Sequence, residues 1–359
     1  MTFDLKELGW DETWASAFAP FVSDGLIPAR VAIEFNYIYR LYAESGELQA
    51  QHAGKLRHEA ASREELSAVG DWVAARPAPG EATATIEAVL PRRSRFSRKV
   101  AGELTEEQIV AANIDTVFIV MGLDGDYNPR RLERYLLLAY ESGATPVVIL
   151  NKSDVADHLS EDLDEIRGLA VGIPVHAISA KARDGIEVIE GYLGAGRTGA
   201  LLGSSGVGKS TLVNALIGEE LLKTQDVRVS DSRGRHTTRH RQLILLPERR
   251  GLLVDTPGMR ELQLWTQHEG SRETFDDILG LAQGCHFTDC RHRDEPRCAV
   301  KQAIEAGALA ADRLEGFLKL QEELHSLETR KNVRAQIDEK RKIKSVSQSL
   351  KKLYKSRDR

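Results

Sequence analysis

The sequence predicts a multidomain α/β protein: a small N-terminal β-barrel, a central and mostly parallel sheet with helices on both faces, and a helical C-terminal part. Two regions with different patterns of hydrophobic residues support this prediction. Between residues 29 and 100, short alternating segments are rich in β-branched and aromatic residues, as in a small barrel such as an OB-fold. From about residue 112, apolar strand-like runs alternate with helical segments, which indicates a parallel sheet.

Length and composition fit a globular protein with two or three domains. The chain has 359 residues, of which 42% are hydrophobic and 29% charged. We place the domain boundaries at 1–100, 101–276 and 277–359. No apolar run approaches the roughly 18–20 residues of a membrane span, and the acidic start MTFDLKELGWDE does not resemble a signal peptide. We therefore expect a cytoplasmic protein without membrane contact. We also expect a monomer.

The N-terminal part begins with a predicted helix. Residues 1–25 read as an amphipathic helix with exposed aromatic side chains at Trp10, Trp14 and Phe18. Barrel strands follow in RVAIEFNYIYRLYAE, GELQAQHAG, VGDWVAA and ATATIEAVLPRR. The pattern alone leaves OB-fold and SH3-like barrels open. It also leaves open whether the barrel binds RNA or protein.

The central part alternates strands and helices. The predicted strands are DTVFIVMG, TPVVILN, PVHAISA, TGALLG, TTRHRQLILLP and GLLVDTPG. The predicted helices are PRRLERYLLLAYESG, EDLDEIRGL, DGIEVIEGYL and KSTLVNALIG. After about residue 275 the chain is expected to be helical, with a Cys/His cluster interrupting the helices.

Charge is unevenly distributed. Residues 330–359 carry 12 Lys and Arg but only 3 Asp and Glu, a net +9, which leaves −14 for the rest of a chain whose total is −5. The segment PRRSRFSRK at 91–99 adds five positive charges, and we expect phosphate contacts from Arg92, Arg93, Arg95, Arg98 and Lys99. Such basic surfaces favour nucleic acid as a partner; a solvated helix and a disordered tail are the alternative.

GSSGVGKS at 203–210 matches the phosphate-loop pattern G-x-x-x-x-G-K-[ST] in full. An apolar strand precedes it and a helix follows, as the motif requires. Backbone N–H groups of such a loop face phosphate oxygens, the lysine reaches the β- and γ-phosphates, and the serine ligates Mg²⁺. The predicted nucleotide-binding residues here are Gly203, Ser204, Ser205, Gly206, Val207, Gly208, Lys209, Ser210 and Thr211. The alternative is an ordinary glycine-rich turn.

Two further segments match the parts of a nucleotide switch. In DTPG at 255–258, Asp255 ends an apolar strand, where it would hold Mg²⁺, and the Gly258 N–H would sense the γ-phosphate. Between the loop and DTPG lies SRGRHTTRHR, in which Thr238, or else Thr237, is the predicted Mg²⁺ ligand. Met259 stands where many GTPases have glutamine, so His236 is the candidate for positioning water, with an ordinary loop histidine as the alternative.

NKSD at 151–154 matches the guanine-reading pattern N-K-x-D. Asp154 would accept hydrogen bonds from guanine, Asn151 would tether neighbouring loops, and Lys152 would pack near the base. SAK at 179–181 would offer the Ala180 N–H to guanine O6, flanked by Ser179 and Lys181. Both motifs follow predicted strands, where ligands bind in open α/β sheets. They precede the phosphate loop, so we infer a circularly permuted P-loop GTPase domain that uses GTP/GDP and Mg²⁺.

All three cysteines fall in one short segment. Cys285, Cys290, His292 and Cys298 have the spacing C-x4-C-x-H-x5-C, and three thiolates with one imidazole can form a closed structural zinc site. His286 directly follows Cys285, and it is a less suitable ligand because the side chains of two consecutive residues rarely bind the same metal ion. We predict one bound Zn²⁺; reduced cysteines without metal are the alternative.

Together NKSD, SAK, GSSGVGKS, GRHTT, DTPG and the cysteine spacing resemble the ribosome small subunit-dependent GTPase A (RsgA) family of circularly permuted GTPases. The resemblance covers nearly the whole chain. It implies an N-terminal OB-fold, a C-terminal zinc-binding domain, and binding to the small ribosomal subunit and its rRNA in late maturation, with subunit-stimulated GTP hydrolysis. It also favours the switch histidine, His236, as the hydrolytic residue. With Lys209 and Thr238 from the motifs above, His236 makes up the predicted catalytic set. A nucleotide-regulated RNA-binding switch, and a GTPase acting on tRNA or another complex, are the rival functions.

Overall fold

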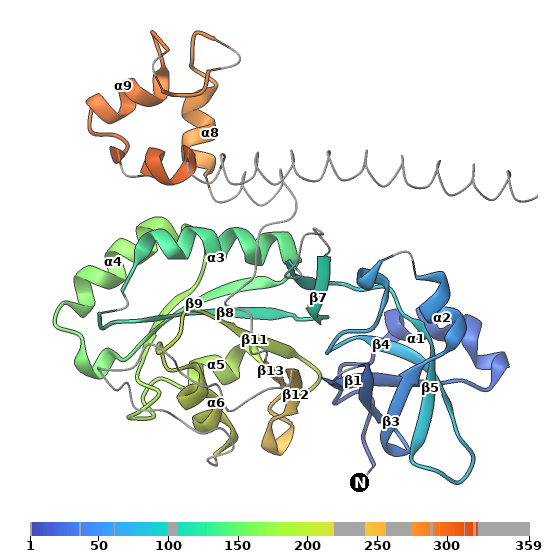
Figure 1. Ribbon diagram of the computed structural model, residues 1–359. Helices are drawn as coiled ribbons and strands as arrows, with labels where there is room; N and C mark the ends of the chain where they lie inside the picture. The colour runs from blue at the N-terminus through green and yellow to red at the C-terminus, as the bar shows by residue number, and fades with distance from the viewer. Residues whose placement is uncertain are drawn as a thin grey trace, which may run out of the picture. The chain divides into compact units, whose positions relative to one another are not determined.

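The structure is a computed structural model that describes residues 2–35, 37–60, 62–99, 107–125, 127–218, 241–255, 275–287, 290–293, 295–311, 313–318 and 321. Of these residues, those up to 255 form one compact unit and those from 275 form a second. Figure 1 shows the elements of each unit. Among the described residues, no helix has the length and apolar character that a bilayer crossing requires.

The N-terminal segment packs its aromatic side chains inward. Helix α1 (Glu12–Phe18) begins at Asp11, whose side chain caps the first turn, and a 3-10 helix (Ala19–Asp24) follows. The expectation of exposed aromatics here is wrong, since Trp14 and Phe18 are only 3% and 5% exposed. Trp10 and Trp14 lie 4.7 and 6.3 Å from Trp72, measured between ring centroids. The sequence pattern does not show that these aromatic side chains are buried, because the strand that covers them is distant along the chain.

The N-terminal barrel is closed and has five strands. They are β1 (Ile27–Phe35), β2 (Ile38–Ala43), β3 (Gly46–His52), β4 (Trp72–Pro77) and β5 (Thr83–Val89), with α2 (Gly54–Glu59) and a 3-10 turn (Arg63–Glu65) after β3. Their order is β1-β2-β3-β5-β4, and β4 returns to pair with β1. β3 and β5 run parallel, and the other pairs run antiparallel. This OB-like connectivity confirms the predicted fold of this part.

A small hairpin links the barrel to the central sheet. Strands β6 (Arg95–Lys99) and β7 (Glu107–Ala112) form an antiparallel pair. The basic segment PRRSRFSRK therefore contributes its second half to a strand, which the sequence pattern did not predict.

The central sheet confirms the predicted alternation of strands and helices. Its elements are β8 (Thr116–Gly122), α3 (Pro129–Ser142), β9 (Thr145–Asn151), α4 (Leu159–Leu169), β10 (Val175–Ile178), α5 (Glu187–Tyr192), β11 (Thr198–Leu202), α6 (Lys209–Ile217), β12 (Arg241–Leu245) and β13 (Leu252–Asp255). The strand order is β10-β9-β8-β11-β13-β12, parallel except at β12. Helices α3 and α4 cover one face, and α5 and α6 cover the other (Figure 1).

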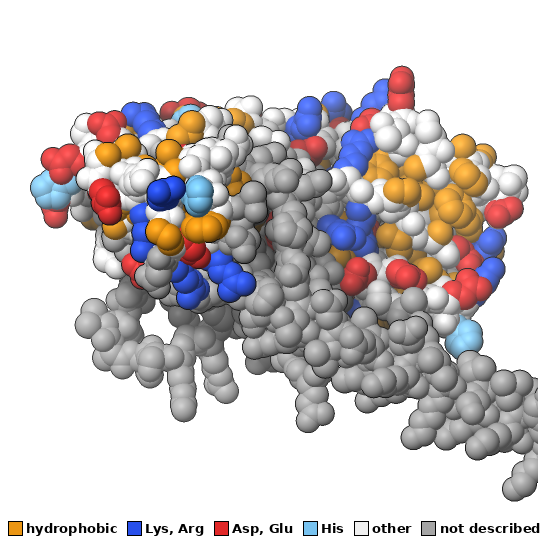
Figure 2. All heavy atoms as spheres, turned by 90° about the horizontal axis from the view of Figure 1, so that it is seen from above, with side chains coloured by type: hydrophobic (Ala, Val, Ile, Leu, Met, Phe, Trp, Pro, Cys, Tyr) orange, Lys and Arg blue, Asp and Glu red, His pale blue; other side chains and the backbone are white. Residues whose placement is uncertain are grey.

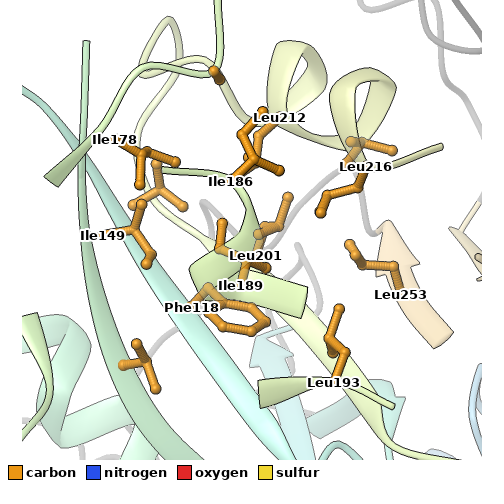
Figure 3. Packing of buried hydrophobic residues seen from close by; sticks show 14 of the residues in the cluster. Phe118, Ile149, Ile178, Ile186, Ile189, Leu193, Leu201, Leu212, Leu216 and Leu253 are labelled. Carbon is orange, nitrogen blue, oxygen red and sulfur yellow. The ribbon is translucent and has the colours of Figure 1, made fainter. Parts of the chain in front are cut away.

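The core beneath the phosphate loop is built from neighbouring strands and two helices. Phe118, Ile149 and Leu201 project from β8, β9 and β11 towards residues of α5 and α6 such as Ile189 and Leu212 (Figure 3). All belong to one buried apolar cluster, and none is more than 7% exposed. Burying each such side chain contributes roughly 1.5–3 kcal/mol. This packing fixes the strand ends from which the candidate site extends.

The barrel and the central sheet share one continuous sheet. Barrel strand β1 pairs antiparallel with β12, with Glu34 opposite Arg241. The Arg241 guanidinium lies 2.9 Å from the Glu34 carboxylate, and both side chains are largely buried. Eleven described strands are therefore hydrogen-bonded in series. The predicted elements of the barrel and the sheet are correct, but no sequence pattern indicated that they join.

The second unit contains two short helices around the Cys/His segment. They are α8 (Asp276–Ala282) and α9 (Ala299–Glu305). Phe275 packs against Phe317 with ring centroids 5.3 Å apart, and Arg313 forms an ion pair with Asp277. This helical character confirms the prediction for the described part of the C-terminal region.

Candidate nucleotide site and metal centre

The phosphate-loop segment turns tightly between β11 and α6. Gly203, Gly206 and Gly208 all have positive φ, a backbone conformation that residues other than glycine rarely adopt. Space adds a second constraint at two of them. A Cβ on Gly203 would lie 2.2 Å from the Val120 carbonyl oxygen, and one on Gly208 would lie 2.3 Å from Nδ2 of Asn151. The loop can take this shape only with glycine at these positions.

Lys209 begins α6 and folds back over the loop. Its Nζ donates to the carbonyl oxygens of Gly203, at 2.7 Å, and Ser204. The ammonium group therefore lies at the mouth of the loop, where an anion can bind it. Ser210 and Thr211 follow in the first turn of α6, and the Ser210 residue is exposed. This placement leaves its hydroxyl open to a metal ion.

Asn151 joins the three predicted nucleotide loops. Its Nδ2 donates to the Val207 carbonyl at 2.7 Å, and its Oδ1 accepts the Ala180 N–H at 2.9 Å. Asn151 is 2% exposed, so both hydrogen bonds are buried. Val207 belongs to GSSGVGKS, Ala180 to SAK and Asn151 to NKSD. The structure thus brings together segments that are 29 and 56 residues from Asn151 along the chain.

Asp154 is oriented by SAK. Its Oδ1 accepts a hydrogen bond of 2.6 Å from the Ser179 hydroxyl, and that hydroxyl in turn accepts the Ala182 N–H at 3.1 Å. One carboxylate oxygen is therefore anchored to the neighbouring loop. Such a fixed carboxylate can present its other oxygen to the two adjacent N–H groups on the edge of guanine.

Lys152 has an unusual backbone for its residue type. Its φ is 71°, in the left-handed region. Residues other than glycine that are held in this strained conformation are found most often at functional sites. Its ammonium group contacts the carboxylate of Asp124, in the loop after β8. This contact fixes the end of the Lys152 side chain against the loop that follows β8. Lys181, on the other loop, is exposed.

The sheet topology explains why these segments meet. NKSD follows β9, SAK follows β10, the phosphate loop follows β11, and Asp255 ends β13. These four strands are parallel, so their carboxyl ends share one edge, which is where ligands bind in open α/β sheets. Four other predicted site residues, namely His236, Thr237, Thr238 and Gly258, lie outside the described residues, as do Met259 and the basic tail.

The Cys/His segment forms a compact cluster in the second unit. The ligand atoms of Cys285, Cys290, His292 and Cys298 all lie within 4.8 Å of one another. The Cys285 and Cys298 sulfurs are 3.9 Å apart, and His292 Nδ1 is 3.6 and 3.4 Å from them. A tetrahedral zinc ion with 2.3 Å sulfur bonds requires sulfur–sulfur distances of about 3.8 Å. The cluster therefore could hold a zinc ion.

The surroundings favour the metal-binding forms of two ligands. Burial raises the pKa of the Cys285 thiol, but the N–H groups of Val300 and Ala299 donate to the sulfur, and the net result is a lowered pKa. The neighbouring Cys290 differs, because burial raises the pKa of its thiol to about 11. Burial lowers the pKa of His292, which keeps the imidazole neutral. A thiolate and a neutral imidazole are the forms that bind zinc. His286 is not part of the cluster. This agrees with the expectation drawn from its position directly after Cys285.

The basic segment at 91–99 is partly occupied within the protein. Arg92 is largely buried and forms a two-pronged ion pair with Asp71, at 2.8 and 2.7 Å. The expectation that it contacts phosphate is wrong, because its charge stabilises the barrel. Arg93 lies 4.5 Å above the Trp14 ring and 2.6 Å from Asp11, with 43% of its side chain exposed. Arg95 is exposed, and the side chains of Arg98 and Lys99 lie outside the described residues.

Comparisons with known proteins agree with this geometry. The model of the RsgA GTPase family matches residues 89–265, and that of a 50S ribosome-binding GTPase family matches residues 198–355. A small ribosomal subunit biogenesis GTPase RsgA of Opitutus terrae is 47% identical over 328 residues, covering 89% of each chain. The chain belongs to the RsgA GTPase family. A second RsgA relative, from Oceanobacillus iheyensis, is 46% identical and covers 90% of this chain and 92% of its own.

Two solved structures have a similar fold. YjeQ from Thermotoga maritima matches with a TM-score of 0.59 and 27% identity, covering 84% of this chain and 98% of that one. YloQ, described as a circularly permuted GTPase, matches with a TM-score of 0.58 and 22% identity over 85% and 96% of the two chains. The likeness to YloQ bears on the fold alone. It agrees with the permuted order of NKSD, SAK and the phosphate loop.

Two residues at this site were missed by the sequence analysis. Asp124 contacts Lys152, and the Arg131 guanidinium lies 2.6 Å from the Ser204 hydroxyl of the phosphate loop. Neither belongs to a recognised motif. Both follow β8, however, which the sequence already predicted as a parallel strand. The rule that ligands gather beyond the carboxyl ends of such strands could have directed attention to this segment.

Proposed function

We propose that this chain hydrolyses GTP to GDP and phosphate while bound to the small ribosomal subunit, and that it acts in late maturation of that subunit in the cytoplasm. One observation carries the nucleotide part: buried Asn151 hydrogen-bonds both the phosphate loop and SAK, so base reader and phosphate site form one unit. The names of the relatives, which are GTPases of small-subunit biogenesis, support the ribosomal part.

The proposed roles of residues follow the motifs. Asp154 reads guanine, assisted by Asn151, Lys152 and SAK, and the backbone of 203–208 binds the phosphates with Lys209. Ser210 and Thr238 ligate Mg²⁺, Asp255 and Gly258 complete the phosphate end, and His236 positions the attacking water. One zinc ion, held by Cys285, Cys290, His292 and Cys298, is structural. We further propose the domain bounds 1–100, 101–276 and 277–359 and a monomeric state.

The barrel offers a surface that suits RNA. At the β1–β2 corner, Phe35, Tyr37 and Ile38 are 49%, 43% and 39% exposed, and the Arg57 guanidinium lies 5.6 Å from the Tyr37 ring centroid. Exposed aromatic rings beside arginine can stack bases and contact phosphates. On the barrel face drawn in Figure 2, hydrophobic side chains also lie together, bordered by Lys and Arg on one side and by Asp and Glu on others. These features support rRNA as the part of the subunit that is bound.

Two measurements test the proposal. In sedimentation with separated ribosomal subunits and a non-hydrolysable GTP analogue, the protein should travel with small subunits and not with large ones. In single-turnover hydrolysis, small subunits should accelerate GTP cleavage, and His236→Ala should remove most of that acceleration. Absence of co-sedimentation would discard the ribosomal role and favour tRNA or another complex. Binding without acceleration, with His236→Ala unchanged, would favour a switch that does not hydrolyse GTP.

A further inference from the structure

Arg131 reaches the phosphate loop from a different part of the chain. It lies in the first turn of α3, which begins with Pro129 and is capped by Asn128, whose side chain accepts the Arg131 N–H at 3.1 Å. Helix α3 follows β8, and β8 is the parallel neighbour of β11. The start of α3 and the end of β11 therefore belong to the same edge of the sheet.

The contact itself is short and specific. Arg131 Nη1 donates to Ser204 Oγ at 2.6 Å, across 73 residues of sequence, and the pair is partly buried. A hydrogen bond with a charged donor is stronger than one between neutral groups, and partial burial strengthens it further. Ser204 is the second residue of GSSGVGKS. The guanidinium is thus attached to the loop that the proposed function assigns to phosphate binding.

Two cationic side chains meet at Ser204. Arg131 donates to its hydroxyl, and Lys209 donates to its carbonyl oxygen and to that of Gly203. Positive charges at such a loop attract the phosphate groups of a nucleotide more strongly than they attract an uncharged ligand.

We propose that Arg131 is a positioning residue for the phosphate chain of the nucleotide. Its guanidinium orients Ser204, and so the first half of the loop, and it adds a positive charge on the α3 side of the phosphates. This inference rests on the proposed nucleotide site but assigns a residue outside its motifs. A purely structural tie between α3 and the loop would instead affect folding without regard to the number of phosphates on the ligand.

The experiment compares GTP, GDP and guanosine binding by the full-length protein. Arg131→Met, which keeps the length of the side chain without its charge, should weaken GTP and GDP binding about tenfold or more and leave guanosine binding unchanged. Arg131→Lys should recover part of the loss, because it keeps the charge but not the planar donor group. Ser204→Ala should cost less than Arg131→Met. The double variant should lose less than the product of the two single losses, because the residues act together.

Controls separate this inference from its rivals. Arg167→Met changes an exposed arginine of α4 that pairs only weakly with Asp164, and it should bind all three ligands like the wild type. Thermal unfolding shows whether each variant is folded; if Arg131→Met is not, Arg131→Lys and Ser204→Ala carry the test. Equal losses for guanosine and GTP, or no loss in any folded variant, would overturn the inference. If the wild-type protein itself binds no guanine nucleotide, the proposed function fails instead.

Discussion

At the residue scale, Asn151 and Asp154 of the proposed guanine site have different hydrogen-bond partners. Asn151 is buried and bonds only to protein backbone, whereas one oxygen of Asp154 bonds to Ser179. Asn151 therefore maintains the shape of the site, and Asp154 is the residue that we propose contacts the base. Losing the Asn151 amide would leave buried backbone groups unpaired, at roughly 1–3 kcal/mol each.

The base preference should follow the chemistry of residue 154. We expect Asp154→Asn to weaken GTP binding by at least tenfold and to strengthen XTP binding, because an amide can donate to the second carbonyl of xanthine while a carboxylate cannot. Competition against a fluorescent nucleotide measures both affinities. Ser179→Ala is the matched variant: it should weaken GTP binding only a few-fold without improving XTP. Unchanged preference in Asp154→Asn would contradict this role.

His52 gives the barrel a predictable response to acid. Burial, with a smaller contribution from Arg57, lowers its pKa to about 4. Its Nε2 accepts the Ser67 N–H at 3.2 Å, and its Nδ1 has no hydrogen-bond partner among the described residues. Between about pH 6.5 and 4 the unfolded chain therefore binds a proton that the folded chain does not. The free energy of unfolding should fall by about 2–3 kcal/mol across this window.

A variant can isolate this effect. His52→Gln should flatten the loss of stability between pH 6.5 and 4, measured by urea unfolding at several pH values. His58→Gln, at an exposed position of α2, should retain the wild-type slope. If the two variants show the same slope, His52 does not control the acid response.

At the element scale, strand-and-helix patterns were reliable where each element packs against its neighbours in sequence. The run TPVVILN became β9, and the glycine-terminated segment before it became α3. The exposure expected for the N-terminal aromatic side chains is wrong because Trp14 packs against Trp72, 58 residues away along the chain. Periodicity reports which face of an element is apolar but not which distant element covers it.

The fold of the Cys/His segment should depend on a bound metal ion. We expect about one zinc ion per chain, and a strong chelator should lower the melting temperature of the second unit, because only short helices and few apolar residues surround the cluster. Metal analysis and circular dichroism measure these effects. Acid should also release the metal, since thiolates and imidazole must be deprotonated to bind it.

Two histidines of the Cys/His segment, six residues apart, provide the control. His292→Ala should reduce zinc affinity at least 100-fold, whereas His286→Ala should retain zinc, because only His292 lies in the cluster. Retention of zinc in His292→Ala would show that the metal, if present, is bound elsewhere.

At the scale of the whole molecule, one buried arginine connects the barrel to the nucleotide domain. Arg30 of β1 is 2% exposed. It donates to the carbonyl oxygens of Gly70, Leu8 and Asn113 and, at 2.9 Å, to the Thr198 hydroxyl at the start of β11. Burial lowers the pKa of its guanidinium to about 10, so it remains charged near neutral pH. Together with the β1–β12 pairing, it makes the barrel and the sheet one mechanical body.

Removing this arginine should separate the two parts. Arg30→Met removes the guanidinium donor from the buried carbonyl oxygens of Leu8 and Asn113, whereas the Gly70 oxygen keeps Asn113 Nδ2 as a donor. We expect a loss of about 3–5 kcal/mol in the free energy of unfolding. Urea unfolding of the wild-type first unit should be a single transition, and the variant should unfold in two steps. Arg76→Met, which changes an exposed arginine of the same barrel, should preserve the single transition. A single, unshifted transition in Arg30→Met would refute the connection.

The sequence by itself determined the strands of the barrel, the strands and helices of the central sheet, the permuted motif order and the cysteine spacing. These depend on local periodicity and on residue types that a given chemistry requires. It could not determine that Asn151 bridges three loops, that Arg131 meets Ser204, that Arg92 is held by Asp71, or that β1 extends the sheet at β12. These contacts join residues far apart in the chain. They exist because parallel strands bring their carboxyl ends to one edge and a closed barrel brings β4 back to β1, and only the packing of the folded chain decides which side chains then meet.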